Sequence, residues 1–253
     1  MDEKEKLTQH VKAVPQYLND KRMVDVLTQI PDLNRRLLCL HRYIRILDKR
    51  SGKWVDEHWA FTKDDYKEWK KTDDFKLRGR EIKAIQDRFT KSNKGYKLIA
   101  GSKFRPLAKQ IDNWNENKSV RLNSETYFNL ALTELKKPSY CGLDTFLDTT
   151  NPKCTESEVT SIQTFYNFLN QKYRPKPSLM VATPGFSNHG TGLAIDFVVK
   201  KTDGTVIVSA TNASKWTSSG WAEKLATAMR GAAHFNGPLK TPNEPWHWTF
   251  DPD

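Results

Sequence analysis

The sequence has few of the features that mark membrane, fibrous or low-complexity proteins. No apolar run approaches the roughly 18–20 residues that a membrane-spanning helix needs, so no such helix is expected. Glycine and proline number 12 each among 253 residues, which argues against a collagen-like or linker-like chain. With 37% hydrophobic and 28% charged residues, the composition is instead that of a globular protein that can bury a core.

Cysteine is also scarce, and the first residues do not form a secretory signal. The three cysteines, Cys39, Cys141 and Cys154, include no CxxC pair, which argues against a cysteine zinc site. Cys141 and Cys154 flank a 12-residue stretch, so they are either a loop disulfide in an oxidising compartment or two unrelated thiols. The opening MDEKEKLTQH is acidic and polar. We therefore expect a protein made in the cytoplasm without a signal peptide.

Acidic residues are outnumbered, and the excess of basic residues is uneven. The chain has 41 Lys and Arg against 30 Asp and Glu, a net charge of +11. Residues 1–97 hold 24 basic and 16 acidic side chains, whereas residues 98–253 hold 17 and 14. The N-terminal excess is compatible with a polyanionic partner, such as nucleic acid, an anionic membrane surface or an acidic cell-wall polymer. It is equally compatible with a solvated surface of mixed charge.

Apolar periodicity predicts helices in the first part of the chain. Most of residues 1–50 has helical spacing, and the basic stretch 33–47 is either a helix on an anionic surface or an ordinary packed helix, which we favour. Aromatic and basic residues interleave over 51–75, which is typical of a small core or of a stacking surface. A further helix is predicted over 78–92. The polar run 90–95 then predicts a domain boundary, with a mostly helical region 1–95 before a domain 96–253.

The second part of the chain changes from helices to strands. Helices are predicted over 120–136 and 156–173. After Pro175, the runs LAIDFVV and TVIVS, joined by KKTDG, predict a β-hairpin. A helix over 219–231 and a last strand in EPWHWTF follow. The predicted fold class is therefore α+β, with flanking helices and a small antiparallel sheet.

Two polar residues near the predicted hairpin point to a metal site. Asp196 lies inside the apolar run LAIDFVV, where a carboxylate is costly unless it is paired or bound to a metal. His189 lies in the preceding glycine-containing loop, SNHGTGLA. Small residues at Gly190, Gly192 and Ala194 leave room for an ion and a substrate. Imidazole nitrogen and carboxylate oxygen are both good zinc ligands.

The run EPWH near the C-terminus adds the remaining chemistry. His247 completes a set of three ligands, which leaves a fourth position open as in catalytic zinc sites. Glu244 is in the neighbourhood to accept a proton from an attacking water. Trp246 and Trp248 flank His247 and are expected to shield the site or orient the ring. Each residue alone has an ordinary structural explanation, and only their joint occurrence favours a catalytic zinc centre.

These two motifs resemble those of the LAS group of zinc peptidases. The pattern SxHxxGxAxD, filled here by SNHGTGLAID, is followed some 50 residues later by ExWH, filled by EPWH. Among these peptidases the sequence is most similar to VanY-type D-alanyl-D-alanine carboxypeptidases and phage L-alanyl-D-glutamate endopeptidases (endolysins). The resemblance is specific over 184–197 and 244–248 and weaker over 120–183. Residues 1–95 resemble no family that we can name.

The resemblance implies a hedgehog-like zinc peptidase domain that cleaves the stem peptide of peptidoglycan. It implies zinc bound by His189, Asp196 and His247, Glu244 as the catalytic base, and Ser187 and Trp246 as residues that contact the substrate. Either the D-Ala-D-Ala bond or the L-Ala-D-Glu bond is compatible with it, and the cell wall would be degraded. The alternative is a catalytically silent, zinc-containing binding module on the same fold, against which the intact Glu244 argues.

One departure from the family concerns an arginine that holds the substrate carboxylate or the oxyanion. The family arginine precedes a glutamine that we matched to Gln163, but the stretch here, ESEVTSIQ, has no arginine and places Glu158 near that point. Arg174 and Arg121 are the substitutes considered. His234 is a spare candidate that either stabilises the oxyanion or has a structural or surface role, and we favour the structural or surface role.

The expected setting follows from the missing signal. The protein would act on the cell wall, in the periplasm or outside the cell, as an antibacterial enzyme after holin-type release, virion delivery or specialised secretion. Such routes allow for a delivery or immunity partner. The basic region 1–95 would bind an anionic wall or membrane surface, and no nucleic-acid partner is expected.

Overall fold

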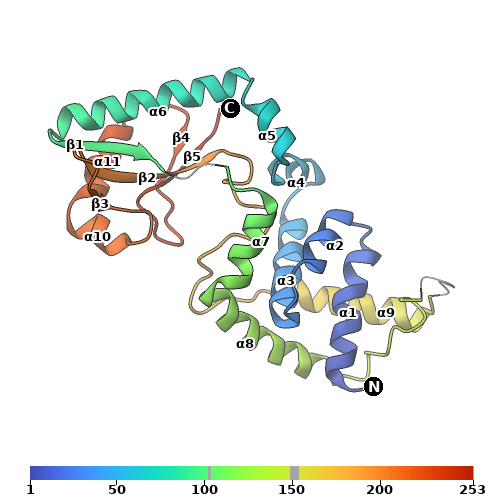
Figure 1. Cartoon of the computed structure of the whole chain (residues 1–253). Coiled ribbons are helices and arrows are strands. Elements are labelled where there is room, and N and C mark those ends of the chain that lie inside the picture. The colour runs from blue at the N-terminus through green and yellow to red at the C-terminus, as the bar shows by residue number, and fades with distance from the viewer. Residues whose placement is uncertain (102–103, 149–153, 253) are drawn as a thin grey trace. The chain divides into compact units, whose positions relative to one another are not determined.

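The computed structural model describes residues 1–101, 104–148 and 154–252. The chain folds into two compact units, each built from two separate segments. Unit 1 contains Met1–Glu57 and Ala108–Gly185, and unit 2 contains His58–Leu107 and Phe186–Asp253. Helices and a small antiparallel sheet are both present, which confirms the predicted α+β class (Figure 1).

Unit 1 is built from helices, and no strand occurs among its described residues. Its elements, including two helices that reach its borders with unit 2, are α1 (Glu3–Tyr17), α2 (Lys21–Thr28), α3 (Leu33–Lys49), α4 (Gly52–His58), α7 (Leu107–Glu116), α8 (Lys118–Glu134) and α9 (Glu156–Leu169). Helix α3 contacts α1, α2, α8 and α9, so it forms the centre of this unit.

The sequence of α3 explains its central place. Asp32 caps its N-terminus by accepting a hydrogen bond from the amide of Arg35 at 2.8 Å. Leu37, Leu40 and Ile44 are fully buried, at the spacing of one helix face. The stretch 33–47 is therefore the ordinary packed helix that we favoured, and its apolar face is covered by protein.

Unit 2 contains the sheet and the helices that pack on it. Its elements are α5 (Lys63–Trp69), α6 (Asp73–Ser92), β1 (Tyr96–Ala100), β2 (Ala194–Lys201), β3 (Val206–Val208), α10 (Ala213–Ser218), α11 (Trp221–Met229), β4 (Phe235–Asn236) and β5 (His247–Phe250). The strand order is β1-β2-β5-β4, β3 also pairs with β2, and every pairing is antiparallel. Strand β2 is thus the centre of the sheet.

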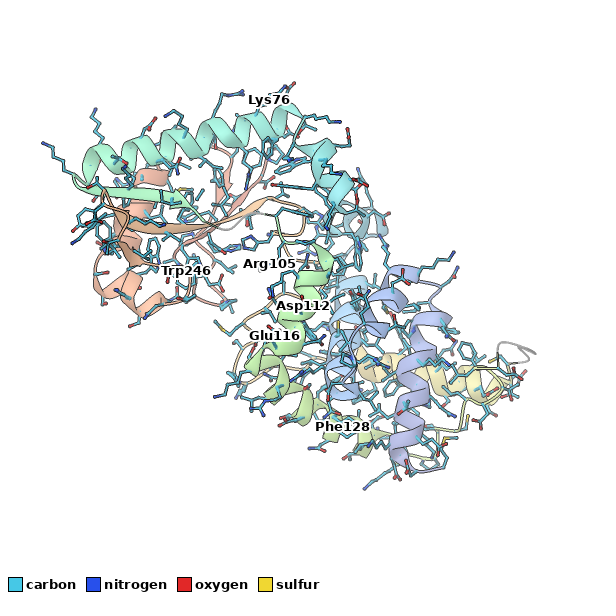
Figure 2. The ribbon with its side chains drawn as sticks, in the orientation of Figure 1. Lys76, Arg105, Asp112, Glu116, Phe128 and Trp246 are labelled. Carbon is cyan, nitrogen blue, oxygen red and sulfur yellow. The ribbon has the colours of Figure 1, made fainter. Side chains whose placement is uncertain are left out.

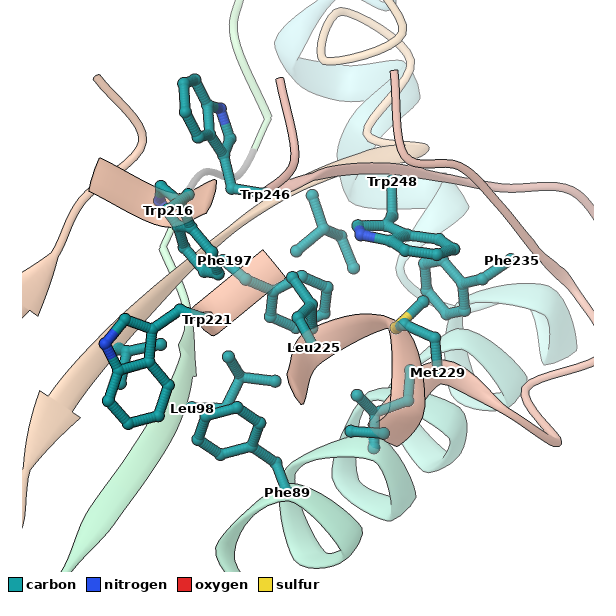
Figure 3. Close-up of a cluster of buried hydrophobic side chains, with 14 of the residues drawn as sticks. Phe89, Leu98, Phe197, Trp216, Trp221, Leu225, Met229, Phe235, Trp246 and Trp248 are labelled. Carbon is teal, nitrogen blue, oxygen red and sulfur yellow. The ribbon is translucent and has the colours of Figure 1, made fainter. Parts of the chain in front are cut away.

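The hydrophobic core of unit 2 lies between the sheet and helices α6 and α11 (Figure 3). Because side chains alternate along a strand, Ile195 and Phe197 of β2 point into this core, where Phe89 of α6 and Leu225 of α11 also lie. Alternation leaves Asp196 on the opposite face of β2. Only one face of the run LAIDFVV is therefore buried in the apolar core, and Asp196 lies on the other face.

The division of the chain differs from the boundary that we predicted at residue 95. Strand β1 pairs with β2 from Tyr96↔Lys201 to Ala100↔Phe197, and Ile85 and Phe89 of α6 share the core of β2. The polar run 90–95 is the end of α6 and the turn into β1. Its composition is that of a linker because a solvent-exposed turn needs the same residues. Strand β1 is an element that the sequence patterns did not predict.

The other predicted elements are found close to their expected positions. The helices predicted over 78–92, 120–136, 156–173 and 219–231 correspond to α6, α8, α9 and α11. The predicted hairpin is the β2–β3 pair, and the predicted last strand is β5. No helix in the described residues is long and apolar enough to cross a membrane.

The cysteines are free thiols in this structure. Cys39 is buried, Cys141 is half-buried and Cys154 is exposed. The disulfide considered between Cys141 and Cys154 is not formed. Residues 149–153, which are part of the segment between these two cysteines, lie outside the described residues.

Candidate metal centre and active site

Sheet pairing brings the two predicted motifs together. Strands β2 and β5 pair so that Asp196 lies directly opposite His247, and the amide of Phe197 donates to the carbonyl of Trp246 at 3.0 Å. Side chains of directly opposed residues project from the same face of the sheet. The carboxylate Oδ1 of Asp196 consequently lies 2.9 Å from Nδ1 of His247. Two residues 51 positions apart thus meet through strand register.

The loop before β2 supplies the third side chain of the cluster. Nε2 of His189 lies 3.3 Å from Oδ2 of Asp196, and its ring centroid lies 5.0 Å from that of His247. The loop is held by its own backbone, because the carbonyl of Asn188 accepts hydrogen bonds from the amides of Leu193 and Ala194. His189 therefore faces Asp196 from a short, internally bonded turn.

Glu244 lies beside this cluster on the turn that enters β5. Its Oε2 is 3.7 Å from Nδ1 of His247, and the amide of His247 donates to the carbonyl of Glu244 at 3.0 Å. The amide of Glu244 donates to the carbonyl of Leu239 at 2.9 Å. Its side chain is 19% exposed, so the carboxylate is still open to solvent. A small molecule at the cluster would meet this carboxylate.

Burial and hydrogen bonds set the charges of the cluster. Burial lowers the pKa of His189, although Asp196 opposes the shift, so the imidazole is held in its neutral form. Burial also acts to raise the pKa of Asp196, but hydrogen bonds from His189 and His247 outweigh it and lower the pKa overall. Burial raises the pKa of Glu244. A neutral imidazole and an ionised carboxylate are the forms that bind a metal ion.

The donor atoms fit a zinc ion in number, type and spacing. One ligand atom each from His189, Asp196 and His247 lies within 4.8 Å of the others, and this is the candidate metal-binding group found among the described residues. Ligands at about 2.0–2.1 Å from a tetrahedral zinc ion lie roughly 3.3–3.4 Å apart. Each imidazole contacts a different oxygen of Asp196, at 2.9 Å for His247 and 3.3 Å for His189, so the carboxylate lies between the two rings. The set has three protein donors, as catalytic zinc sites do.

Ser187 and Trp246, the other predicted site residues, are largely buried. Ser187 is 8% exposed, and its carbonyl accepts from the amide of Gly190 in the loop that carries His189. Trp246 is 6% exposed and belongs to the core, with its ring centroid 6.3 Å from that of Trp216. Both are adjacent to ligand candidates in sequence, but Trp246 packs in the core and has little free surface for a ligand.

Sequence reasoning missed Arg105, a cationic residue at the site. Its amide donates to the carbonyl of His189 at 2.8 Å. Burial is the largest influence on the pKa values of His189 and Glu244, and the positive charge of Arg105 acts to lower both. Arg105 follows β1, and Figure 2 labels it together with Trp246. The signal that would have found it is the apolar run Leu98–Ala100 followed closely by Phe-Arg-Pro.

The stretch that we had matched to the family arginine has a structural role in unit 1. Glu158 caps α9, and its carboxylate also accepts hydrogen bonds from the amides of Thr145 and Phe146 at 2.9 and 3.1 Å. Gln163 donates to the hydroxyl of Tyr17 at 2.8 Å. Arg121 and Arg174 also belong to unit 1.

His234 has the structural role that we assigned to it. Its Nδ1 lies 2.8 Å from Oε1 of Glu81, which ties the segment at β4 to helix α6. The carbonyl of His234 accepts from the amide of Asp251. The ring is thus engaged by a partner outside the cluster of His189, Asp196 and His247.

Comparison with known families agrees with the motifs and their geometry. The model of the VanY family of D-alanyl-D-alanine carboxypeptidases matches residues 76–253, from helix α6 to the C-terminus. The chain therefore belongs to this family, a family of peptidases that act on peptidoglycan. No curated protein and no solved structure shows significant similarity to the chain.

Proposed function

We propose that this protein is a zinc-dependent peptidase that hydrolyses an amide bond in the peptidoglycan stem peptide. The observation that carries the proposal is the convergence of His189, Asp196 and His247, with the carboxylate of Glu244 at 3.7 Å from His247. A bound zinc ion would polarise the carbonyl under attack and acidify water. The three converging side chains would hold that ion.

Glu244 has the position and the exposure for general acid–base catalysis. Its carboxylate is next to the cluster and 19% exposed, so water reaches it. We assign to it the removal of a proton from the attacking water and the delivery of that proton to the leaving amine. His189 and Asp196 are engaged with one another and would keep the ligand geometry during this transfer.

Arg105 supports a substrate that carries a carboxylate next to the scissile bond. A guanidinium group forms strong, charge-assisted hydrogen bonds with carboxylates. The C-terminal D-Ala of a stem peptide ends in such a carboxylate, whereas an internal amide has less need of a cationic anchor. The position of Arg105 beside His189 therefore favours the D-Ala-D-Ala carboxypeptidase reaction over the L-Ala-D-Glu endopeptidase reaction.

The proposal is tested by digesting purified peptidoglycan and identifying the released products by mass spectrometry. We expect the zinc-loaded wild-type protein to release terminal D-Ala. Glu244→Gln should lower the rate by about 100- to 10,000-fold, because the general base is lost while zinc is retained. Glu223→Gln, which changes an exposed glutamate on α11, is the matched control and should keep wild-type activity.

The other outcomes of this digestion distinguish the alternatives. Fragments cut between L-Ala and the next residue would identify an endopeptidase. A wild-type protein that holds zinc but cuts nothing would point to the catalytically silent binding module. Equal activity in wild type and Glu244→Gln would contradict the role of Glu244.

We also propose an anionic partner, which the sequence predicted for residues 1–95, and we assign its binding to the part of this region that belongs to unit 2. Residues 58–107, which belong to unit 2, have 14 basic and 7 acidic side chains. The basic excess of the N-terminal part therefore lies mainly on the unit that carries the cluster. We propose that this unit meets the anionic wall surface, in the periplasm or outside the cell. Loss of wall binding on raising the salt concentration would support it.

A further inference from the structure

A segment before the family match packs directly on the loop that carries His189. Helix α5 begins after Thr62, whose side chain and that of Asp65 form a reciprocal cap. The preceding residue, Phe61, donates its amide to the carbonyl of Gly190 at 2.9 Å. The family match begins only at residue 76. Helix α5 therefore lies outside the family match, and the residue before its N-cap is bonded to the loop that carries His189.

Tyr66 of α5 contacts two separate segments of that site. A Cβ added to Gly192 would lie 2.8 Å from Cε2 of Tyr66 and 2.8 Å from Cζ3 of Trp69. Gly192 has φ +73°, so the absence of a side chain serves both its backbone conformation and this close approach. The ring of Tyr66 also stacks on Phe104, with centroids 4.1 Å apart and planes at 8°.

The two segments that Tyr66 contacts carry His189 and Arg105. Gly192 closes the turn of His189, since its amide donates to the carbonyl of His189 at 3.3 Å. Phe104 immediately precedes Arg105, whose amide donates to that same carbonyl at 2.8 Å. One ring therefore packs on both sides of the junction between a proposed metal ligand and the proposed substrate anchor.

Neighbouring aromatic residues hold the ring of Tyr66 in place. Trp69 lies 5.8 Å from it, and Phe75 packs edge-on against Trp69 at 5.1 Å. The guanidinium of Arg78 lies 5.6 Å from the centre of the Trp69 ring. Ring contacts of this kind are favourable beyond the area that they bury. Tyr66 is thus part of a packed aromatic group and has a defined place beside the loop.

We propose that Tyr66 is a positioning residue, which fixes the His189 loop against the segment of Arg105 and so sets the spacing of zinc and substrate carboxylate. The proposal rests on the proposed function for its effect on catalysis. Its structural part, the clamping of two backbone segments, is independent of zinc and of substrate.

The test compares Tyr66→Ala with two matched variants. Tyr66→Phe keeps the ring and should behave as wild type. Tyr96→Ala removes a half-buried tyrosine ring from β1 of the same unit, where the ring packs on Trp221 with centroids 4.8 Å apart. This control reports the effect of losing a packed ring in unit 2 without a change at the clamp.

Three measurements on the full-length protein separate positioning from general stability. In Tyr66→Ala we expect the amides of Arg105 and Phe61 to exchange with solvent about tenfold faster than in Tyr96→Ala, because the clamp on both partners is loosened. We expect zinc affinity to fall by about tenfold, as for other residues that orient metal ligands. We also expect KM for a D-Ala-D-Ala peptide to rise by several-fold, which a mere loss of folded protein would not cause.

The outcomes distinguish this proposal from the proposed function. If Tyr66→Ala matches Tyr96→Ala in amide exchange, zinc affinity and KM, Tyr66 has no positioning role, whatever the wild-type enzyme does. If exchange rises only in Tyr66→Ala while the wild type binds no zinc and cuts nothing, the clamp is upheld and the proposed function fails, and with it the catalytic effect assigned to Tyr66.

Discussion

Each of the two units buries a pair of histidines, but the partners of these histidines differ. In unit 1, His10 contacts the carbonyl of Lys6 and the hydroxyl of Ser161, and His41 contacts the carbonyl of Leu169 and the hydroxyl of Tyr127. These partners are neutral and lie in separate places. In unit 2, His189 and His247 converge on one carboxylate, that of Asp196.

The comparison shows what separates a structural histidine from a histidine that is placed to bind a metal ion. Burial alone does not, because all four histidine residues are 9% exposed or less. Neutral partners contact both ring nitrogens of His10 and Nδ1 of His41, and each imidazole is part of a packed interior. A shared carboxylate instead brings three donor atoms within reach of one ion, which is an arrangement that a cation stabilises.

Removing the shared carboxylate should have the largest effect on this contrast. Asp196→Asn keeps the shape of the side chain but removes its charge, so we expect zinc affinity to fall by at least about 100-fold and activity to be lost. His41→Gln, which changes a buried histidine of unit 1, should leave zinc affinity unchanged. Competition with a chromophoric chelator measures both. Equal affinity in Asp196→Asn and wild type would show that the ion, if bound, is held elsewhere.

The histidines of unit 1 should be visible in acid stability. Burial lowers the pKa of His41 to about 4, below its ordinary value of 6.5. Since the unfolded state binds the proton more readily, the stability present above pH 6.5 is lost as the pH falls towards 4, by about 3 kcal/mol. Native-state amide exchange in α3 and α8 measures the change.

His41→Gln provides the control for this acid transition. Glutamine does not titrate in this range, so the variant should be less stable than wild type at pH 7 but lose less stability between pH 6.5 and pH 4. An equal loss in both proteins would assign the acid sensitivity of unit 1 to other groups.

The arginines of the two units offer a smaller and more specific contrast. Arg105→Ala should raise KM for a D-Ala-D-Ala peptide by about 10- to 100-fold, because a hydrogen-bonded charge contributes about 1.5–3 kcal/mol. Arg121→Ala, in unit 1, is the matched control and should leave KM unchanged. Steady-state kinetics with the free acid and the C-terminal amide of one peptide measures this directly. A rise in KM for Arg121→Ala alone would contradict the role of Arg105 and assign the substrate carboxylate to Arg121.

The residues of the cluster, His189, Asp196 and His247, could be predicted from sequence because each motif is local. The spacing of His189 and Asp196, and of Glu244 and His247, lies within ten residues, and an acidic residue in an apolar strand is conspicuous. The pairing that joins the two motifs is a strand register, which was not predicted because it joins residues about 50 positions apart. Helices such as α3 and α11 could be predicted because their apolar period is local as well.

The division into units and the role of Arg105 depend on long-range pairing. Strand β1 is only five residues long and pairs with residues about 100 positions later, so its short apolar run was not recognised as part of the sheet. Because β1 was not predicted, the segment that follows it had no assigned place in the fold, and Arg105 was overlooked. The aromatic stretch 51–75 showed the same ambiguity, because the loop on which Tyr66 packs lies more than 100 residues away.

The proposed zinc site depends most directly on which side chains bind the metal. X-ray absorption at the zinc edge of the full-length, zinc-loaded protein measures them without reference to activity. We predict one zinc per chain, with nitrogen and oxygen ligands at about 2.0–2.2 Å and the outer-shell scattering of two imidazoles. Sulfur ligands at about 2.3 Å, or zinc that does not bind stoichiometrically, would contradict the assignment of His189, Asp196 and His247.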